Sequence, residues 1–235
     1  MKLTVIVTVY NEVNTIIQAI KDVEKIKIDD KEVIIFDNDS TDGTKKLLKE
    51  LKTDYKIVYN DKNINSGSFV KALSMARGEY LYVHHTDLEY DPIAAMDLLR
   101  VAEAGGYDVV LGSRLKNKQG SKWDIIKERP AYLATILCTS LLNLWYEKKF
   151  TDMIGSRIYR TEAVKKIPIG TIGFGFEFEF ISRICKYGLQ VTEIAVPYEP
   201  RSWQEGKKIR PYHLINALFA MFKVRYFEPG KIPWK

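Results

Sequence analysis

The chain has 235 residues, of which 46% are hydrophobic and 28% are charged, as in a globular protein with enough apolar material for a sizeable core. No apolar run reaches the roughly 20 residues of a membrane-spanning helix, so the sequence excludes that class of protein. The net charge of +6 suits an anionic partner such as a nucleotide, a lipid phosphate or a membrane surface, although a solvated lysine-rich surface explains it equally well.

The first half of the chain alternates predicted strands with predicted helices. Helical spacing of apolar residues predicts helices from Asn14, after Gly43, within 63–78 and over 91–104. β-branched and apolar runs predict strands at 3–10, 32–37, 55–60, 80–83 and 107–112. This alternation predicts βαβ units, and therefore an α/β fold with a mainly parallel sheet flanked by helices.

The second half has a different pattern but no linker that would separate two domains. A polar loop at 116–122 leads into a mostly helical stretch that Pro130 interrupts. Beyond it we expect strands at 152–159 and 190–196, helices at 161–166 and 174–187, and a basic loop before the last helix, 212–227. We therefore expect one domain, with residues 1–115 as a nucleotide-binding half and 116–235 as an acceptor-side half.

The last predicted helix and the two cysteines allow further expectations. The helix has basic residues beside aromatic ones, so it either packs on the domain or lies on an anionic membrane surface. Cys138 and Cys185 form no CxxC pair, which favours two buried thiols in a reducing compartment. No signal peptide is visible, which is consistent with a cytoplasmic protein.

The stretch 79–92 carries the clearest chemical signal. Its strand ends abruptly in His84, His85, Thr86 and Asp87, with Glu89 two residues later, and Asp91-Pro92 signals the start of a helix. Ligands of open α/β sheets bind beyond the carboxyl ends of the strands, so we expect a nucleotide diphosphate and its metal here. The chain has neither GxGxxG after its first strand nor GxxxxGK[ST], which argues against a dinucleotide site and a P-loop.

Eight short motifs follow one another in an order that resembles family 2 glycosyltransferases, and the later ones resemble the dolichyl- or polyprenyl-phosphate sugar transferase branch. The resemblance covers nearly the whole chain. It implies a GT-A fold, an inverting mechanism, a UDP- or GDP-sugar donor, a divalent metal (Mn²⁺ or Mg²⁺) and a lipid-phosphate or glycan acceptor. The motifs lie at 8–12 (TVYNE), 37–44 (DNDSTDGT), 76–80 (ARGEY), 87–92 (DLEYDP), 112–114 (GSR), 151–153 (TDM), 174–177 (FGFE) and 201–209 (RSWQEGKKI).

The resemblance assigns a donor-binding role to residues from several of these motifs. Asp37, at the end of the second strand, is expected to recognise the base or the ribose. The basic loop is expected to order when donor binds. The full set expected to bind the nucleotide-sugar is Val9, Tyr10, Glu12, Asp37, Arg114, Arg201, Lys207 and Lys208.

The metal site departs from the family pattern. Asp87 is the expected principal ligand and Glu89 the second, because a hard cation prefers carboxylate oxygen. His85 stands where the resemblance predicts the first Asp of a DxD motif, so the motif is His-Thr-Asp. Imidazole is a poor ligand for Mg²⁺ and a tolerable one for Mn²⁺. His85 thus either changes the metal preference, contacts the phosphate directly, or weakens activity.

The sequence does not single out a general base. The candidates for catalysis are Asp87, Glu177, Glu179 and Asp152. Glu177 and Glu179 are two residues apart, so a helix would not present both on one face. Transfer to a lipid phosphate needs no base, because that oxygen is already ionised, whereas transfer to a hydroxyl needs one.

Three functions stay open at this stage. The leading hypothesis is an inverting transferase that moves a sugar to polyprenyl phosphate as a peripheral enzyme at the cytoplasmic membrane face. The second is a soluble glycosyltransferase that extends a glycan or another hydroxyl acceptor. The third, motivated by His85, is a non-catalytic nucleotide-sugar-binding protein. Nucleic-acid binding is not expected, because the basic residues form no stripe with interleaved aromatics.

Overall fold

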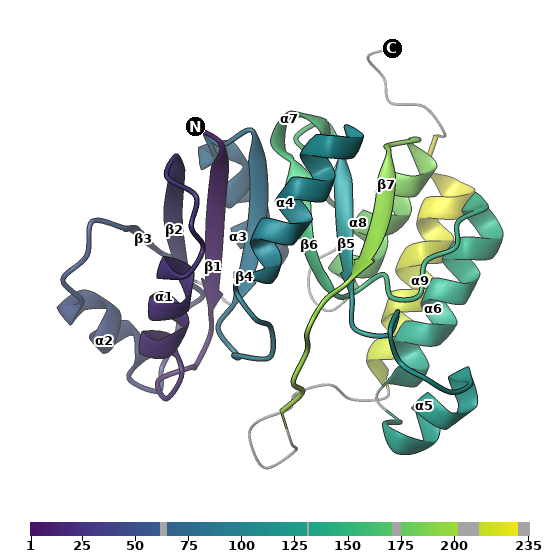
Figure 1. Ribbon diagram of the computed structural model, residues 1–235, viewed down its shortest axis with the longest axis horizontal. Helices are drawn as coiled ribbons and strands as arrows, with labels where there is room; N and C mark the ends of the chain where they lie inside the picture. The colour runs from purple at the N-terminus through teal and green to yellow at the C-terminus, as the bar shows by residue number, and fades with distance from the viewer. Residues whose placement is uncertain (62–64, 131, 171–174, 202–211, 230–235) are drawn as a thin grey trace.

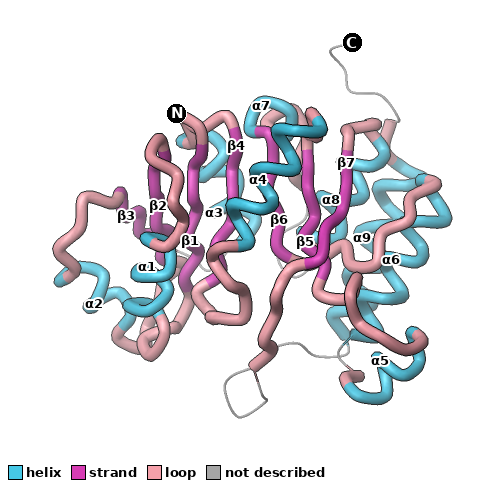
Figure 2. Tube along the Cα trace, viewed as in Figure 1, coloured by secondary structure: helices cyan, strands magenta, loops and turns pink. Residues whose placement is uncertain are grey.

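The computed structural model describes residues 1–61, 65–130, 132–170, 175–201 and 212–229. Figure 1 shows a central sheet with helices on both faces, and Figure 2 shows the long loops at the lower edge of that sheet. The first half of the chain forms β1 (Leu3–Val9), α1 (Ile16–Glu24), β2 (Lys31–Asp37), α2 (Thr44–Glu50), β3 (Lys56–Tyr59), α3 (Asn65–Met75), β4 (Tyr80–His85), α4 (Ala94–Gly105) and β5 (Val109–Ser113).

The second half contributes fewer strands and longer helices. Pro130 lies between two helices, as the sequence predicts, and both predicted strands of this half are present. The elements are α5 (Lys122–Glu128), α6 (Tyr132–Tyr146), β6 (Ser156–Arg160), α7 (Thr161–Val164), α8 (Phe176–Lys186), β7 (Val191–Ala195) and α9 (Tyr212–Phe227).

Within the described residues, seven strands form one sheet in the order β3-β2-β1-β4-β6-β5-β7. All neighbouring pairs are parallel except those that β6 makes with β4 and β5. The predicted α/β class with a mainly parallel sheet is therefore confirmed. The strand order reverses around β1 and β4, and open α/β sheets bind their ligands at such a switch point. Because β1, β2, β4 and β5 are parallel, their carboxyl ends meet at one edge, the lower one in Figure 1.

Each face of the sheet buries its own hydrophobic core. One core joins the sheet to α3, α6, α8 and α9 through residues such as Phe69, Cys138 and Phe180. The other joins it to α1 and α4 through residues such as Ile20 and Leu98. Alternate residues of a strand supply the two cores, which is why a mostly apolar strand such as β1 suits the centre of the sheet. Both cysteines are buried free thiols, as predicted.

Two predicted helix starts differ from the observed ones. The first helix begins after Thr15 rather than Asn14, and the Thr15 hydroxyl bonds the Glu12 carboxylate at 2.9 Å instead of capping the helix. The helix predicted from Asp91 begins at Ala94. Asp91 Oδ1 accepts a hydrogen bond from the backbone N–H of Ile93 at 2.9 Å, so the Asp-Pro pair forms a turn that precedes the helix.

Candidate functional site

The loops that follow β1 and β2 are bound to each other by side-chain to backbone hydrogen bonds. Asn11 Oδ1 accepts from the backbone N–H of Thr41 at 2.8 Å, and the backbone N–H of Asn11 donates to Ser40 Oγ at 3.0 Å. The backbone N–H of Glu12 donates to Thr44 Oγ1 at 3.0 Å. Asn11 has a φ of 53°, a left-handed conformation that Asn tolerates better than most residues. This arrangement fixes where Tyr10 and Glu12 lie.

Asp37 ends β2 with its carboxylate fully buried beneath this pair of loops. Its Oδ2 lies 3.4 Å from the backbone N–H of Ser40 and 3.9 Å from Lys45 Nζ. Its Oδ1 has no hydrogen-bond partner among the described residues. An unpaired carboxylate oxygen in a buried site is costly, which points to a donor group supplied from outside the chain. Val9, its register partner in β1, is buried beside it.

The two histidines that end β4 point to opposite faces of the sheet. His84 is 1% exposed, and its burial lowers its pKa to about 4, so the ring is neutral at pH 7. His85 is half-buried, and its ring centroid lies 5.8 Å from that of Tyr90. His84 therefore belongs to the core on the α1 side, whereas His85 reaches the edge where Asp87 lies.

Three carboxylates converge on the guanidinium of Arg201. Its Nη1 lies 3.3 Å from Glu12 Oε2, and its Nη2 lies 3.8 Å from Asp87 Oδ2. Its Nε lies 3.8 Å from Glu89 Oε1, and its backbone N–H donates to the same oxygen at 3.0 Å. The structure thus brings together four residues that the sequence analysis assigned to donor or metal binding, from segments almost 190 positions apart. A basic residue in the middle compensates the mutual repulsion of the acids.

This acidic cluster offers the hard oxygen donors that Mg²⁺ or Mn²⁺ requires. In the part of the chain that the structure describes, however, no group of three or more acidic, histidine or cysteine side chains is arranged to hold a metal ion. The reason is visible in the contacts, because Arg201 separates the carboxylates and Glu89 is bound to Tyr198. The donor set of Asp87 and Glu89 fits a divalent metal, and the guanidinium stands where a cation is attracted.

The segment after β7 crosses this edge and lies against the turn after β4. Tyr90 and Tyr198 form an isolated antiparallel bridge, and their ring centroids are 5.0 Å apart. The Tyr198 hydroxyl donates to Glu89 Oε2 at 2.6 Å. Sequence reasoning missed Tyr198. Its only signal is its place three residues before Arg201, in the loop that the resemblance associates with the phosphates.

Arg114 lies next to this cluster but is held by Asp152. Its Nε donates to Asp152 Oδ2 at 2.6 Å and its Nη2 to Oδ1 at 3.0 Å, a two-pronged contact with a fully buried carboxylate. The guanidinium also lies 5.5 Å and 5.3 Å from the ring centroids of Tyr132 and Tyr198. Arg114 keeps the pKa of the Asp152 carboxyl below its usual value, although burial opposes this.

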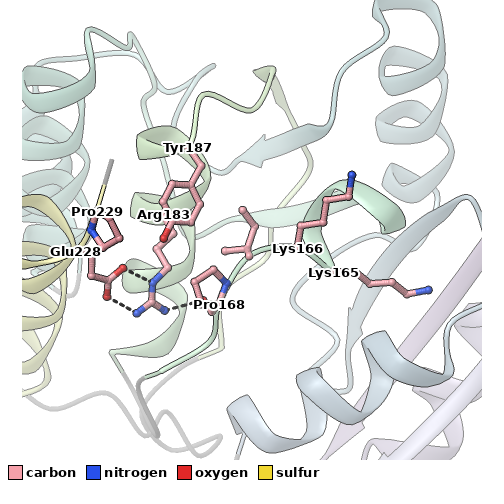
Figure 3. A pocket seen from close by; sticks show the side chains of 8 residues that line it. Lys165, Lys166, Pro168, Arg183, Tyr187, Glu228 and Pro229 are labelled. Atoms are coloured by element: carbon pink, nitrogen blue, oxygen red, sulfur yellow. Dashed lines mark hydrogen bonds and ion pairs between the residues drawn. The ribbon is translucent and has the colours of Figure 1, made fainter. Parts of the chain in front are cut away.

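The two glutamates of α8 lie in different surroundings. Glu177 forms an ion pair with Arg157 at 2.9 Å. Arg157 is the second residue of β6, and β6 begins beside the carboxyl end of β5. Glu179 is fully buried and forms an ion pair with Arg183. Arg183 lines a cavity of about 570 Å³ with Glu228, and Figure 3 shows Lys165 of the segment after α7 at the same cavity.

That cavity lies at the opposite edge of the sheet, because α7 begins at Thr161, whose backbone N–H donates to the carbonyl oxygen of Glu79, just before β4. Of the two glutamates, Glu177 is therefore the one near the carboxyl ends of the strands, in agreement with the expectation that one helical face cannot present both. Lys207 and Lys208 lie outside the described residues.

Comparison with known proteins gives the fold a class. The structure matches glucosyl-3-phosphoglycerate synthase from Mycobacterium tuberculosis, in complex with Mn²⁺, UDP and phosphoglyceric acid, at a TM-score of 0.70 and 13% identity, covering 97% of this chain and 80% of that chain. It also matches residues 1–349 of Staphylococcus aureus TarS in complex with UDP-GlcNAc at a TM-score of 0.63 and 16% identity, covering 95% and 66%. The fold is that of the GT-A glycosyltransferases.

The sequence relatives are consistent with this fold. An uncharacterized protein of Methanocaldococcus jannaschii is 28% identical over 87% of this chain and 93% of its own length. The low-salt glycan biosynthesis hexosyltransferase Agl6 of Haloferax volcanii is 24% identical over 96% of this chain, and the dolichol-phosphate mannosyltransferase of Pyrococcus furiosus is 24% identical over 88%. The chain spans 56% and 59% of the lengths of those two transferases.

The model of the glycosyl transferase family 2 matches residues 4–168, which include β1 to β5 and the turn after β4. The chain belongs to glycosyl transferase family 2 and is a glycosyltransferase.

Proposed function

We propose that this glycosyltransferase moves a sugar from a nucleotide diphosphate donor to a polyprenyl phosphate at the cytoplasmic face of a membrane. The donor half of the proposal is supported by the convergence of Glu12, Asp87, Glu89 and Arg201 at the carboxyl ends of the strands. The acceptor half is supported by the name of the Pyrococcus furiosus relative and by an exposed apolar surface on α6 and α9.

On the donor side, the nucleoside would lie between Tyr10 and the unpaired Oδ1 of Asp37, which would accept a base N–H or a ribose hydroxyl. Val9 and Glu12 would complete that wall. The diphosphate would then extend toward Asp87, where the Arg201 guanidinium would supply positive charge. Cations at this place stabilise the leaving nucleoside diphosphate as its charge develops.

A divalent metal would be held by Asp87 and Glu89, with His85 as a neighbour, and the phosphates of the donor would supply further oxygen ligands. The solved neighbour from Mycobacterium tuberculosis contains Mn²⁺ with UDP. When bound, such a metal neutralises the charge of the diphosphate leaving group. In this chain, Arg201 would have to withdraw from between the carboxylates before the metal could bind both of them.

On the acceptor side, Arg114, Asp152 and Glu177 lie around the end of β5 and the start of α8. A phosphate monoester has a second pKa near 6, so its oxygen is a nucleophile without help from a general base. Asp152, buried and bound to Arg114, would hold that arginine in place rather than accept a proton. Glu177 would orient the sugar or the acceptor.

The exposed apolar surface favours a lipid carrier. Ile215, Phe219, Phe222 and Tyr226 recur at helical spacing on the solvent side of α9 and are between 43% and 73% exposed. Lys223 and Arg225, both exposed, would flank that stripe on either side. An aromatic stripe flanked by basic residues is the pattern of a helix that lies at an anionic membrane surface. No described helix combines the length and hydropathy that crossing a bilayer requires.

The test is a transfer assay with UDP-sugars and GDP-sugars, Mn²⁺ or Mg²⁺, and a short polyprenyl phosphate, in which nucleotide release and sugar-lipid formation are both measured. We expect one donor to react, EDTA to stop the reaction, and Asp87→Ala to lower the rate by at least about a hundredfold. Asp97→Ala, a change on the exposed side of α4, is the matched control and leaves the rate unchanged.

A second candidate acceptor is a hydroxyl of a glycan or a small phosphorylated molecule. It is favoured by the match to a structure that holds phosphoglyceric acid and by the glycan biosynthesis enzyme among the relatives. Sugar transfer to such a hydroxyl, with none to polyprenyl phosphate, would replace the lipid acceptor. Nucleotide binding without any transfer would indicate a binding protein instead.

A further inference from the structure

A second cavity, of about 220 Å³, lies beside the candidate donor site, between the loop after β5, the start of α5 and the middle of α6. Three lysines line it: Lys116, Lys118 and Lys122. A short series of contacts connects it to the acidic cluster. Tyr198, which bonds Glu89, has its ring 5.3 Å from the guanidinium of Arg114, and the next residue, Leu115, lines the cavity. It is therefore close to the donor site but separate from it.

None of the three lysines forms an ion pair within the described residues, although the Glu193 carboxylate attracts Lys116. Lys116 Nζ donates to the Glu193 carbonyl oxygen at 2.5 Å, and Lys122 Nζ donates to Ser140 Oγ at 2.9 Å. Lys118 Nζ lies 5.9 Å from the centre of the Tyr132 ring. Each of these partners is neutral, and each ammonium has three N–H donors, so donors remain for a ligand.

No acidic residue lines the cavity among the described residues. Two carboxylates lie near it but are already bound. That of Glu193 accepts from the backbone N–H groups of Thr151 and Asp152 at 2.8 and 2.9 Å and from the Thr151 hydroxyl. That of Asp124, beside the lining residue Gly120, accepts from the backbone N–H and the hydroxyl of Ser121 at 2.8 and 2.7 Å. Of the hydroxyls that line the cavity, those of Ser140 and Thr151 donate to the Ile136 carbonyl oxygen and to Glu193, so the Thr139 hydroxyl is the one that adds a donor among the described residues. Ammonium donors in a lining that contains no acidic side chain are suited to a phosphate oxygen.

The rest of the cavity is apolar, with Leu115, Ile125, Ile136 and Phe150 in its wall. A free inorganic ion would leave these side chains without a partner. A ligand that carries its phosphate on an apolar chain would satisfy both parts of the wall.

The surface outside the cavity indicates where such a chain would lie. Leu133, Leu137, Ser140 and Leu144 recur at spacings of four, three and four residues, so they share one face of α6. The three leucines are exposed, by 45%, 45% and 77%. Ser140, which Lys122 bonds, lies within this stripe. The cavity rim therefore borders a row of exposed leucines.

We propose that this cavity binds the phosphate of an anionic lipid, with the lipid chain lying along the leucine face of α6. Trp145 of α6, the residue after Leu144, contacts Phe222 and Tyr226 of α9 at 4.9 and 5.9 Å between ring centroids, so the aromatic stripe of α9 packs on α6 one residue beyond the leucine face. Lysines at phosphate level beside leucines in the acyl region are the arrangement of an interfacial lipid site. The site lies outside the reacting centre. It rests on the proposed function in one respect, which is that both proposals place this face of the protein on a membrane.

The experiment titrates the full chain with a short-chain phosphatidic acid that stays monomeric, and separately with glycerol 3-phosphate, which is the same headgroup without chains. NMR follows the methyl groups of Leu137 and Ile136. The test variant is Lys118→Gln/Lys122→Gln, and the control is Lys27→Gln/Lys52→Gln, which removes two exposed lysines elsewhere. A second readout is binding to phosphatidylcholine vesicles with and without phosphatidic acid.

We expect the short lipid to bind at least about tenfold more tightly than glycerol 3-phosphate, because only the lipid buries apolar chain. The test variant should lose about 30-fold in vesicle affinity, at five- to sixfold for each lysine, and the control should lose less than about twofold. Equal binding of glycerol 3-phosphate would assign the cavity to a soluble phosphate and overturn the lipid proposal. Equal losses in both variants, or no binding of either probe, would also overturn it.

A measurement of nucleotide binding distinguishes a failure of the lipid site from a failure of the proposed function. The test variant should bind nucleotide with Mn²⁺ as the unaltered chain does, since the lysines do not touch the acidic cluster. Normal nucleotide binding without lipid binding defeats the lipid site alone. Absent nucleotide binding in the unaltered chain defeats the donor half of the proposed function and leaves the lipid titration to be judged by itself.

Discussion

Arg201 Nη2 lies 3.8 Å from Asp87 Oδ2, and the same guanidinium reaches Glu12 at 3.3 Å, so one cation links the segments that follow β1 and β4. A metal ion that binds Asp87 would approach this guanidinium at close range, and two cations repel each other. We therefore expect Arg201 to compete with the metal when no nucleotide is bound and to contact the phosphates when nucleotide is present.

The first prediction concerns this competition. Arg201→Gln should bind Mn²⁺ alone about tenfold more tightly, because a like charge is removed from the acidic cluster, whereas its affinity for nucleotide with Mn²⁺ should fall. Calorimetry measures both affinities. Arg100→Gln, which removes an exposed arginine that pairs with Asp97, should change neither. Weaker Mn²⁺ binding by Arg201→Gln would show that the arginine organises the carboxylates rather than competing with the metal.

The second prediction concerns the buried end of β2. Asp37→Asn keeps the size of the side chain but replaces one acceptor oxygen with an NH₂ group. It should weaken nucleotide binding by about tenfold to a hundredfold, because hydrogen bonds to a charged group contribute about 1.5–3 kcal/mol. Equilibrium titration of the nucleotide measures this loss. Asp39→Asn, a change at the half-exposed neighbour that pairs with Lys45, serves as the control. Unchanged nucleotide affinity in Asp37→Asn would remove Asp37 from the site.

Most of the fold was predictable because most strands are short runs rich in β-branched or aromatic residues, and helices such as α1 and α4 have a clear apolar period. The motifs also predicted which residues meet at the carboxyl edge, since parallel strands bring their ends together. The contact between Arg201 and the three acids was not predictable in detail, because it joins residues almost 190 positions apart. The bond from Tyr198 to Glu89 was missed for the same reason.

Some side chains have partners other than the expected ones, because a sequence does not show which of several possible partners a side chain will bind. The resemblance associates Arg114 with phosphates, but Asp152 offers it a buried, two-pronged contact. Glu179 carries the same charge as Glu177 two residues earlier, yet only the helical phase decides that it pairs with Arg183 inside the protein. Thr15 precedes the first helix, but Glu12 takes its hydroxyl.

The third prediction concerns the pair of Arg114 and Asp152. Arg114→Met should lower the free energy of unfolding by about 3–5 kcal/mol, because it leaves a buried carboxylate without its counter-charge. Adding Asp152→Asn removes that charge and should restore part of the loss. Urea unfolding at pH 7 measures each variant. A double variant less stable than Arg114→Met alone would show that the hydrogen bonds of Asp152 matter more than its charge.

The same pair has a pH dependence whose sign follows from the lowered pKa of Asp152. A carboxyl with a lower pKa in the folded state adds stability above its unfolded pKa of about 4 and loses it as the pH falls through the folded value. The unaltered chain should therefore lose stability on acidification below about pH 4 more steeply than Arg114→Met does.

The last prediction concerns His84, whose burial lowers its pKa to about 4. The unfolded chain takes up a proton near pH 6.5, whereas the folded chain does not until about pH 4. The stability that the neutral ring allows is therefore complete above pH 6.5 and is lost as the pH falls toward 4, by about 3 kcal/mol in total.

His84→Leu has no proton to bind, so its unfolding free energy should stay nearly flat over that window, apart from contributions of other groups. His85→Gln removes the neighbouring ring whose charge also lowers the pKa of His84, but it leaves the burial of His84, so it should reduce the slope only in part. Urea titrations at half-unit steps from pH 7 to pH 4.5 measure the three slopes. If His84→Leu loses stability with acid as steeply as the unaltered chain, the ring is protonated within the folded protein, and a nearby acid such as Asp22 compensates its burial.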